Sequence, residues 1–237
     1  MSGALNSVLG GSGSGGLLGI VGGIVGEVMG GPIGEMIGQA VGNMLQQAIG
    51  DSVKDASKQL SQEDGMPSFL QSLISDKVDQ AVGSIQNNDV TPEAQQTAQD
   101  QYGGAVQNFQ QELTKSLVDN TRQYMESAQD SASTGSGGAT GQRSGKYGGN
   151  SWLEAIAKAM GEVLGDKAAK LVGLSNDISR VANAGGDEQQ QEQAAKQMSA
   201  LQSEMQGTSQ MFSLLQNAFT NAIKSIGEGL AGLARKS

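Results

Sequence analysis

The side chains that usually carry out catalysis are either missing from this sequence or poorly arranged for it. The 237 residues contain no histidine and no cysteine, which excludes a thiol nucleophile, a disulfide framework and a Cys/His metal site. Serine is common, but a serine hydrolase needs a base, and only a lysine could serve here. The acidic residues are scattered without an Asp-x-Asp calcium loop, and the Gly-rich segments lack the GxxxxGK[ST] phosphate-loop spacing. We therefore expect no enzymatic activity, no metal and no cofactor.

Glycine is the residue whose spacing is most regular. It recurs at every fourth position, six times in succession, at Gly22, Gly26, Gly30, Gly34, Gly38 and Gly42. The last two residues of each four-residue unit are apolar, except at Pro32-Ile33. Six glycines in a helix cost roughly 5 kcal/mol relative to alanine, so close packing must offset that cost. Rows of small residues usually allow helix backbones to approach closely, in a membrane or in a tight assembly. We therefore predict these six glycines as helix-packing or membrane-contacting positions.

The glycine repeat lies within residues 17–50, which we predict to form a helical hairpin. The run Gly30-Gly31-Pro32 should break a helix and leave two arms, at about 17–30 and 33–50. Residues 17–34 are only just long enough to span a bilayer. Glu27 and Glu35 would be costly in lipid unless they faced each other, a pore or water. A hairpin lying on the membrane surface is an alternative, and so is burial between protein copies. A low-complexity linker is disfavoured because linkers do not keep apolar pairs in register.

Residues 151–237 are predicted to form an antiparallel, coiled-coil-like helical hairpin. Ser151 and Glu154 have capping-box spacing, and apolar residues then recur at steps of about three and four, interrupted only by Lys167. A Gly-containing turn follows, and Asp187 is the expected N-cap of the second helix. The second helix has a heptad-like apolar seam, which we predict to mediate self-association unless it is simply the hairpin core. The predicted self-association residues are Leu201, Met205, Phe212, Leu215, Phe219 and Ile226. The later glycines Gly227, Gly229 and Gly232 would allow a close neighbour.

The remaining segments complete an all-α, elongated architecture. Residues 1–16 are predicted as a flexible leader, 51–130 as a polar and amphipathic helical region, and 131–150 as a flexible Gly/Ser linker. Thr91-Pro92 is a favourable helix start, with threonine as N-cap and proline in the first turn. Gly103-Gly104 is the expected weak point of the helix that follows.

The charge distribution limits partners and export route. A net charge of −9 disfavours direct nucleic-acid binding through a basic surface. The first basic residue is Lys54, so the chain lacks the basic n-region of a secretory signal peptide. If the protein leaves its cell, we expect a route that is independent of such a signal.

The acidic, cysteine-free, Gly/Ser/Gln-rich composition resembles that of harpins, the helper proteins secreted by bacterial type III systems. The final segment, QMFSLLQNAFTNAIKSIGEGLAGLARKS, is similar to the closing helix of type III needle, filament and hydrophilic translocator proteins. This resemblance implies α-helical hairpins that assemble outside the cell. Simple needle subunits lack a glycine repeat, so the comparison favours a membrane-active helper. The chain also resembles DNA-ejection (pilot) proteins of phages, which pair a Gly-rich apolar N-terminus with Gln-rich helices that form a conduit.

From these features we expect a secreted, non-enzymatic helical protein that self-associates and acts on a target membrane. Its partners would be further copies of itself, membrane lipid, and proteins of the secretion apparatus. Two alternatives remain open. One is a virion ejection component, whose partners would be other virion proteins. The other is a structural assembly subunit whose glycine helix is buried between copies.

Overall fold

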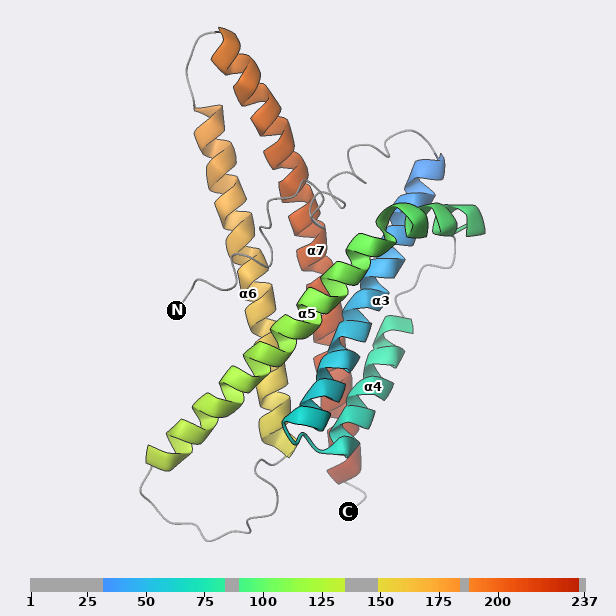
Figure 1. The fold of residues 1–237 in the computed structure, drawn as a ribbon, viewed down its shortest axis with the longest axis vertical. Helices are drawn as coiled ribbons and strands as arrows, with labels where there is room; N and C mark the ends of the chain where they lie inside the picture. The colour runs from blue at the N-terminus through green and yellow to red at the C-terminus, as the bar shows by residue number, and fades with distance from the viewer. Residues whose placement is uncertain (1–31, 84–89, 135–148, 184–187, 235–237) are drawn as a thin grey trace. The chain divides into compact units, whose positions relative to one another are not determined.

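The computed structural model describes residues 32–83, 90–134, 149–183 and 188–234. Within these ranges the chain forms five helices and no strand (Figure 1), which confirms the all-α expectation. The helices are α3 (Pro32–Glu63), α4 (Ser68–Gly83), α5 (Pro92–Thr134), α6 (Gly149–Ala182) and α7 (Glu188–Ala234). The predicted leader 1–16, the first arm of the glycine hairpin and most of the linker 131–150 lie outside the described residues.

The helices contribute to two compact units. The first unit contains the chain up to Gln46 together with Gln86–Phe109 and Leu164–Gln216. The second unit contains Gln47–Ile85, Gln110–Val163 and Asn217–Ser237. This division differs from the segments suggested by the sequence, because α3, α5, α6 and α7 each contribute residues to both units.

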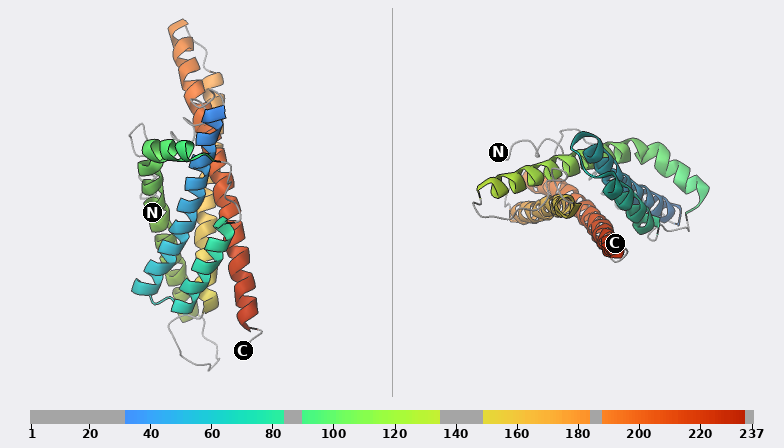
Figure 2. Two further views of the ribbon diagram at one scale, coloured as in Figure 1. Left: turned by 90° about the vertical axis from the view of Figure 1, so that its right-hand side faces the viewer. Right: turned by 90° about the horizontal axis from the view of Figure 1, so that it is seen from below.

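The second unit is built around an apolar core to which all five helices contribute. Its α3 residues recur at helical spacing, and Ile49, Val53 and Leu60 are at most 3% exposed. Figure 2 shows α4 running beside α3, where it adds its own buried apolar row. The other buried members are Leu70, Ile74 and Val78 of α4, Leu113 and Leu117 of α5, Trp152, Ile156 and Met160 of α6, and Phe219, Ala222 and Ile226 of α7.

Helix α3 does not end at residue 50, where the sequence analysis placed a boundary. The buried residues Ile49, Val53 and Leu60 keep their helical spacing across that point, so the apolar face continues and the helix continues with it. The helix ends at Glu63, two residues before Gly65, whose φ of 79° is readily adopted by glycine. There the carbonyl of Leu60 accepts hydrogen bonds from the amides of Asp64 and Met66, both at 3.1 Å. The left-handed conformation of Gly65 lets the chain turn here and enter α4.

Two expected helix starts have different outcomes. Helix α5 begins at Pro92, and the Ala94 amide donates to Thr91 Oγ1 at 3.4 Å, so the predicted N-cap is confirmed. Helix α5 continues through Gly103-Gly104 to Thr134, although Figures 1 and 2 show it bending sharply near its beginning. Helix α6 begins at Gly149, two residues before the predicted capping box. The Glu154 carboxylate of that box instead forms an i,i+4 ion pair with Lys158, at 2.8 Å.

In the first unit, the end of α6 and the beginning of α7 run side by side. The two helices are linked by an ion pair between Lys170 Nζ and Glu204 Oε1, at 2.9 Å. Helix α7 begins at Glu188, directly after the expected N-cap Asp187. Leu174 of α6 and Met211 and Leu215 of α7 are buried in this unit. The ion pair therefore gives a reference point for which residues of the two helices lie level with each other.

Candidate functional site

The predicted packing glycines fall partly within the described residues. Gly22, Gly26 and Gly30 lie outside them. Gly34, Gly38 and Gly42 belong to α3, and Gly38 and Gly42 are half-buried. A Cβ atom added at Gly42 would meet nothing within 4 Å, so Gly42 has no close neighbour among the residues that the structure describes. Its predicted role against a membrane or another copy stays a prediction.

A close helix approach on α3 occurs at Gly50, which lies two four-residue steps beyond Gly42. A Cβ on Gly50 would lie 2.6 Å from Val82 Cγ2 and 3.3 Å from Val78 Cγ1, both on α4. Real Cβ atoms do not come this close to another heavy atom, so a larger residue at this position would force Val82 or the helices to shift. The repeat is interrupted at Gln46 and resumes at Gly50, and this resumption is a sequence signal that could have revealed the position.

Two glycines near the end of α7 also differ in whether another helix lies close to them. A Cβ on Gly229 would lie 2.6 Å from Leu73 Cδ1 and 3.3 Å from Lys77 Cε, both on α4. At Gly227 a Cβ would meet nothing within 4 Å. Gly229 therefore has the close neighbour that its sequence context suggested. Helix α4 packs against a glycine on α3 and a second glycine on α7.

The predicted self-association seam of α7 divides into two groups. Leu215, Phe219 and Ile226 are 0%, 1% and 4% exposed, so in this fold they belong to the core. Leu201, Met205 and Phe212 are only half-buried and keep apolar surface at the helix face. If α7 contacts a further copy of the chain, Leu201, Met205 and Phe212 are the seam residues with apolar surface exposed for that contact.

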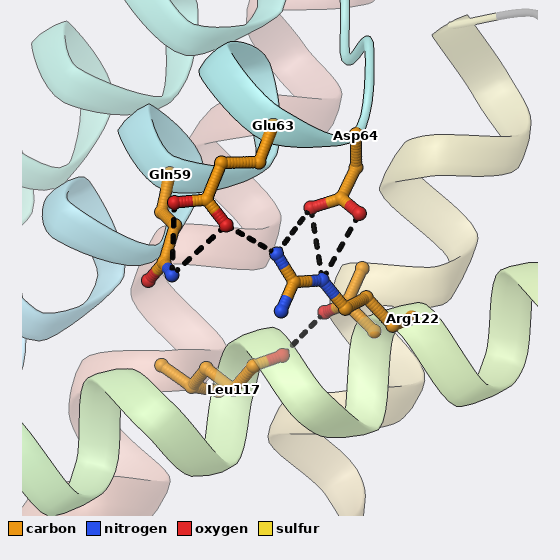
Figure 3. Close-up of polar contacts among 6 residues, drawn as sticks. Gln59, Glu63, Asp64, Leu117 and Arg122 are labelled. Atoms are coloured by element: carbon orange, nitrogen blue, oxygen red, sulfur yellow. Dashed lines mark hydrogen bonds and ion pairs between the residues drawn. The ribbon is translucent and has the colours of Figure 1, made fainter.

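An ion-pair cluster joins the end of α3 to α5 in the second unit (Figure 3). Arg122 Nε donates to both Asp64 carboxylate oxygens, at 3.0 and 2.9 Å, and Arg122 Nη2 donates to Asp64 Oδ2 at 2.8 Å. The same Nη2 donates to Glu63 Oε2 at 2.7 Å, and Gln59 Nε2 lies 3.3 Å from each Glu63 oxygen. This geometry fixes α5 against the helix end at Gly65, because one guanidinium binds two consecutive carboxylates.

The cluster shifts the titration of its members. The hydrogen bond from Arg122, assisted by the one from Gln59, lowers the pKa of Glu63 below its ordinary value. The hydrogen bond to Asp64 is the main cause that raises the pKa of the Arg122 guanidinium. Arg122 is therefore permanently charged and committed to two carboxylates. It is suited to holding helices together.

An open polar groove lies beside this cluster, between α3 and α5. It encloses about 480 Å³ and is lined by Asp55, Gln59, Gln110, Gln111, Thr114, Lys115, Val118, Asp119 and Arg122. Gln110 links the two helices across it, since its side-chain amide donates to Asp55 at 3.1 Å and its backbone carbonyl accepts from the buried Ser52 hydroxyl at 3.1 Å. The lining offers hydrogen-bonding groups with two positive and two negative side chains. It suits a polar contact and has no nucleophile–base pair.

The described residues hold no candidate metal cluster and no candidate membrane span. Across residues 32–83, 90–134, 149–183 and 188–234, no group of three or more acidic side chains is placed to hold a metal ion. Over the same ranges, no helix combines the length and the apolar character needed to cross a bilayer.

Comparisons of the chain with protein-family models, with curated proteins and with solved structures gave no match. The function of this protein is therefore inferred from its own sequence and structure. Sequence reasoning identified the glycine repeat and the α7 seam, but it missed Gly50 and the Arg122 cluster. Arg122 stands alone in a polar stretch, and its partners on α3 are far away in the sequence, so no local pattern pointed to it.

Proposed function

We propose that this chain is a secreted, non-enzymatic helical protein of a bacterial type III-type secretion system that self-associates and acts on a target membrane. The observation that carries the proposal is the Gly-x-apolar-apolar repeat from Gly22 to Leu45, whose glycine spacing is regular and whose apolar pattern departs only at Pro32. Such a repeat gives a helix a flat, apolar and closely approachable surface, which favours helix association in a membrane or at its surface.

The fold supports this proposal by connecting the repeat to a packed helical unit. The last three repeat glycines, Gly34, Gly38 and Gly42, are in α3, and the same helix continues into the core residues Ile49, Val53 and Leu60. A helix association made by the repeat would therefore be coupled directly to the folded part of the chain. The half-buried α7 residues Leu201, Met205 and Phe212 provide a second surface for self-association.

A structural assembly subunit is the second candidate, and one observation favours it. Gly50 and Gly229 both use the absence of a side chain to pack against α4, so this chain already uses glycine for contacts between protein helices. In this alternative the repeat glycines would pack against further copies, and no lipid would be involved. The virion-conduit alternative also requires the helices to pack against further copies. The genes that neighbour this one would distinguish a virion protein from a protein of a secretion system.

The decisive experiment measures dye leakage from anionic vesicles with the full chain and with Gly22→Leu/Gly26→Leu. We expect the variant to lose leakage because two side chains block the close helix approach, while its helical circular dichroism is retained. The matched control is Gly161→Leu/Gly165→Leu. These two α6 glycines are also four residues apart, are exposed, and have nothing within 4 Å of a Cβ, so leakage should persist.

Unchanged leakage in the repeat variant would show that close packing of the repeat is not what perturbs the membrane. If the parent protein neither causes leakage nor floats with vesicles, the membrane proposal is wrong. A repeat variant that then also loses its oligomeric state, measured by light scattering, would establish the structural subunit instead.

A further inference from the structure

The apolar α6 and α7 faces of the first unit are interrupted by polar residues on both helices. Lys167 of α6 is only 4% exposed, although lysine is rarely buried. Thr208 of α7 is fully buried, and its hydroxyl has no hydrogen-bond partner among the described residues. Gly207, next to it, is also buried. Leu174, Met211 and Leu215, by contrast, are ordinary apolar core residues of the same unit.

The two interruptions lie at the same level of the helix pair. The ion pair between Lys170 and Glu204 shows which turns of the antiparallel helices meet. Moving three residues down α6 from Lys170 leads to Lys167, and moving about one turn up α7 from Glu204 leads to Gly207 and Thr208. Lys167 therefore lies opposite the turn of α7 that has no side chain at one position and a hydroxyl at the next.

We infer that Lys167, Gly207 and Thr208 form a polar layer that fixes the register in which α6 and α7 pair. An apolar heptad-like seam can pair almost equally well after a shift of seven residues, because leucine or methionine then meets leucine or methionine. A polar residue within such a seam specifies register, at some cost in stability. Here a seven-residue shift would place the Lys167 stem against Leu214-Leu215 in one direction, or against Ala200-Leu201 in the other. Both alternatives replace the small and polar pair with a bulky apolar residue.

The test measures register directly with two spin labels on the full chain. The sequence contains no cysteine, so Val172→Cys and Gln202→Cys introduce unique attachment points on α6 and α7, both at exposed positions. We expect pulsed electron paramagnetic resonance to give one narrow distance in this labelled background. With Lys167→Met and Thr208→Val added, we expect a second distance population from helices shifted by roughly 10 Å along their axes. Thr208→Val alone should raise the melting temperature by about 2–4 °C, because it removes a buried hydroxyl that has no hydrogen-bond partner among the described residues.

The control for the threonine change is Thr121→Val. Thr121 is equally buried, but its hydroxyl donates to the Leu117 carbonyl at 2.6 Å, so its loss should lower the melting temperature and leave the single distance unchanged. A single, unchanged distance in the Lys167→Met/Thr208→Val protein overturns the inference, whatever its melting temperature.

A relocation experiment decides the question if that variant does not fold. Lys167→Leu with Leu174→Lys moves the charge by one heptad, and Thr208→Leu with Leu201→Thr moves the hydroxyl by the same distance. We expect all four changes together to restore one narrow distance, whereas the two α6 changes alone should broaden it. One narrow distance in the protein with only the α6 changes would overturn the inference as well.

Discussion

Gly42 and Gly50 lie on the same helix, yet their surroundings predict opposite effects of the same substitution. At Gly42 a methyl group meets open space, so Gly42→Ala should stabilise the fold by about 0.5–1 kcal/mol through helix propensity. At Gly50 the methyl group would collide with Val82, and Gly50→Ala should destabilise the fold by about 1–2 kcal/mol, as overpacking does. Urea denaturation would measure both values. Adding Val82→Ala to Gly50→Ala should recover much of the loss, and failure to do so would contradict the steric explanation.

Arg122 is the second residue whose replacement has a defined outcome. Arg122→Met keeps the aliphatic stem but removes the three hydrogen bonds to Asp64 and the one to Glu63, and we expect a loss of about 1 kcal/mol. Arg122→Lys should retain only part of this contribution, because a lysine ammonium cannot bind both carboxylates with the same fixed geometry.

The same cluster predicts a pH dependence. Since Arg122 lowers the pKa of Glu63, the carboxylate contributes stability above its ordinary pKa of 4.5, and this contribution is lost as the pH falls through the lower folded-state value. The stability of the parent protein should therefore fall below about pH 4.5 more steeply than that of Arg122→Met. Denaturation midpoints collected between pH 3 and pH 7 would test this, and parallel curves for the two proteins would contradict it.

At the scale of the elements, α7 contributes to the core with one part of its seam and exposes another. Phe219 is buried, so Phe219→Ala should cost about 3–5 kcal/mol of folding free energy. Leu201 is half-buried, so Leu201→Gln should cost much less in folding but should lower the average mass in light scattering at high protein concentration. Met205→Gln and Phe212→Gln should have the same effect. If none of the three variants changes self-association, this face of α7 is not an association surface.

Helix α4 shows how an element that looks unremarkable in sequence becomes central to packing. It is the shortest of the five helices within the described residues. Even so, it contacts Gly50 of α3 through Val82 and Gly229 of α7 through Leu73. Its amphipathic pattern predicted that it is helical, but nothing in that pattern indicated which glycines of other helices would pack against it.

For the whole molecule, the proposed function predicts a change of assembly state on contact with lipid. We expect the purified protein to grow in mass when anionic vesicles are added, and the protein should float with them, because the apolar repeat would be transferred from water into the interface. The variant Gly22→Leu/Gly26→Leu should bind vesicles but form smaller assemblies, since it retains the apolar surface and loses the close approach. Flotation without any increase in assembly size would indicate a membrane anchor that does not oligomerise.

The all-α fold was predictable from local spacing, and the division of the chain was not. Steps of three and four between apolar residues identify helices one turn at a time, and Thr91 also identified a helix start. The two compact units cut across α3, α5, α6 and α7. Helix spacing carries no information about where along a long helix its packing partners change, so a segmentation based on composition could not find these boundaries.

The sequence by itself determined that this protein is helical, that it lacks histidine and cysteine, and that glycine recurs at a packing interval, because these are properties of residue type and short-range spacing. Only the tertiary structure decided which glycines have close neighbours, which seam residues are core, and that Arg122 binds Glu63 and Asp64. These contacts join residues that are far apart along the chain, so the spacing of residues within one helix does not specify them.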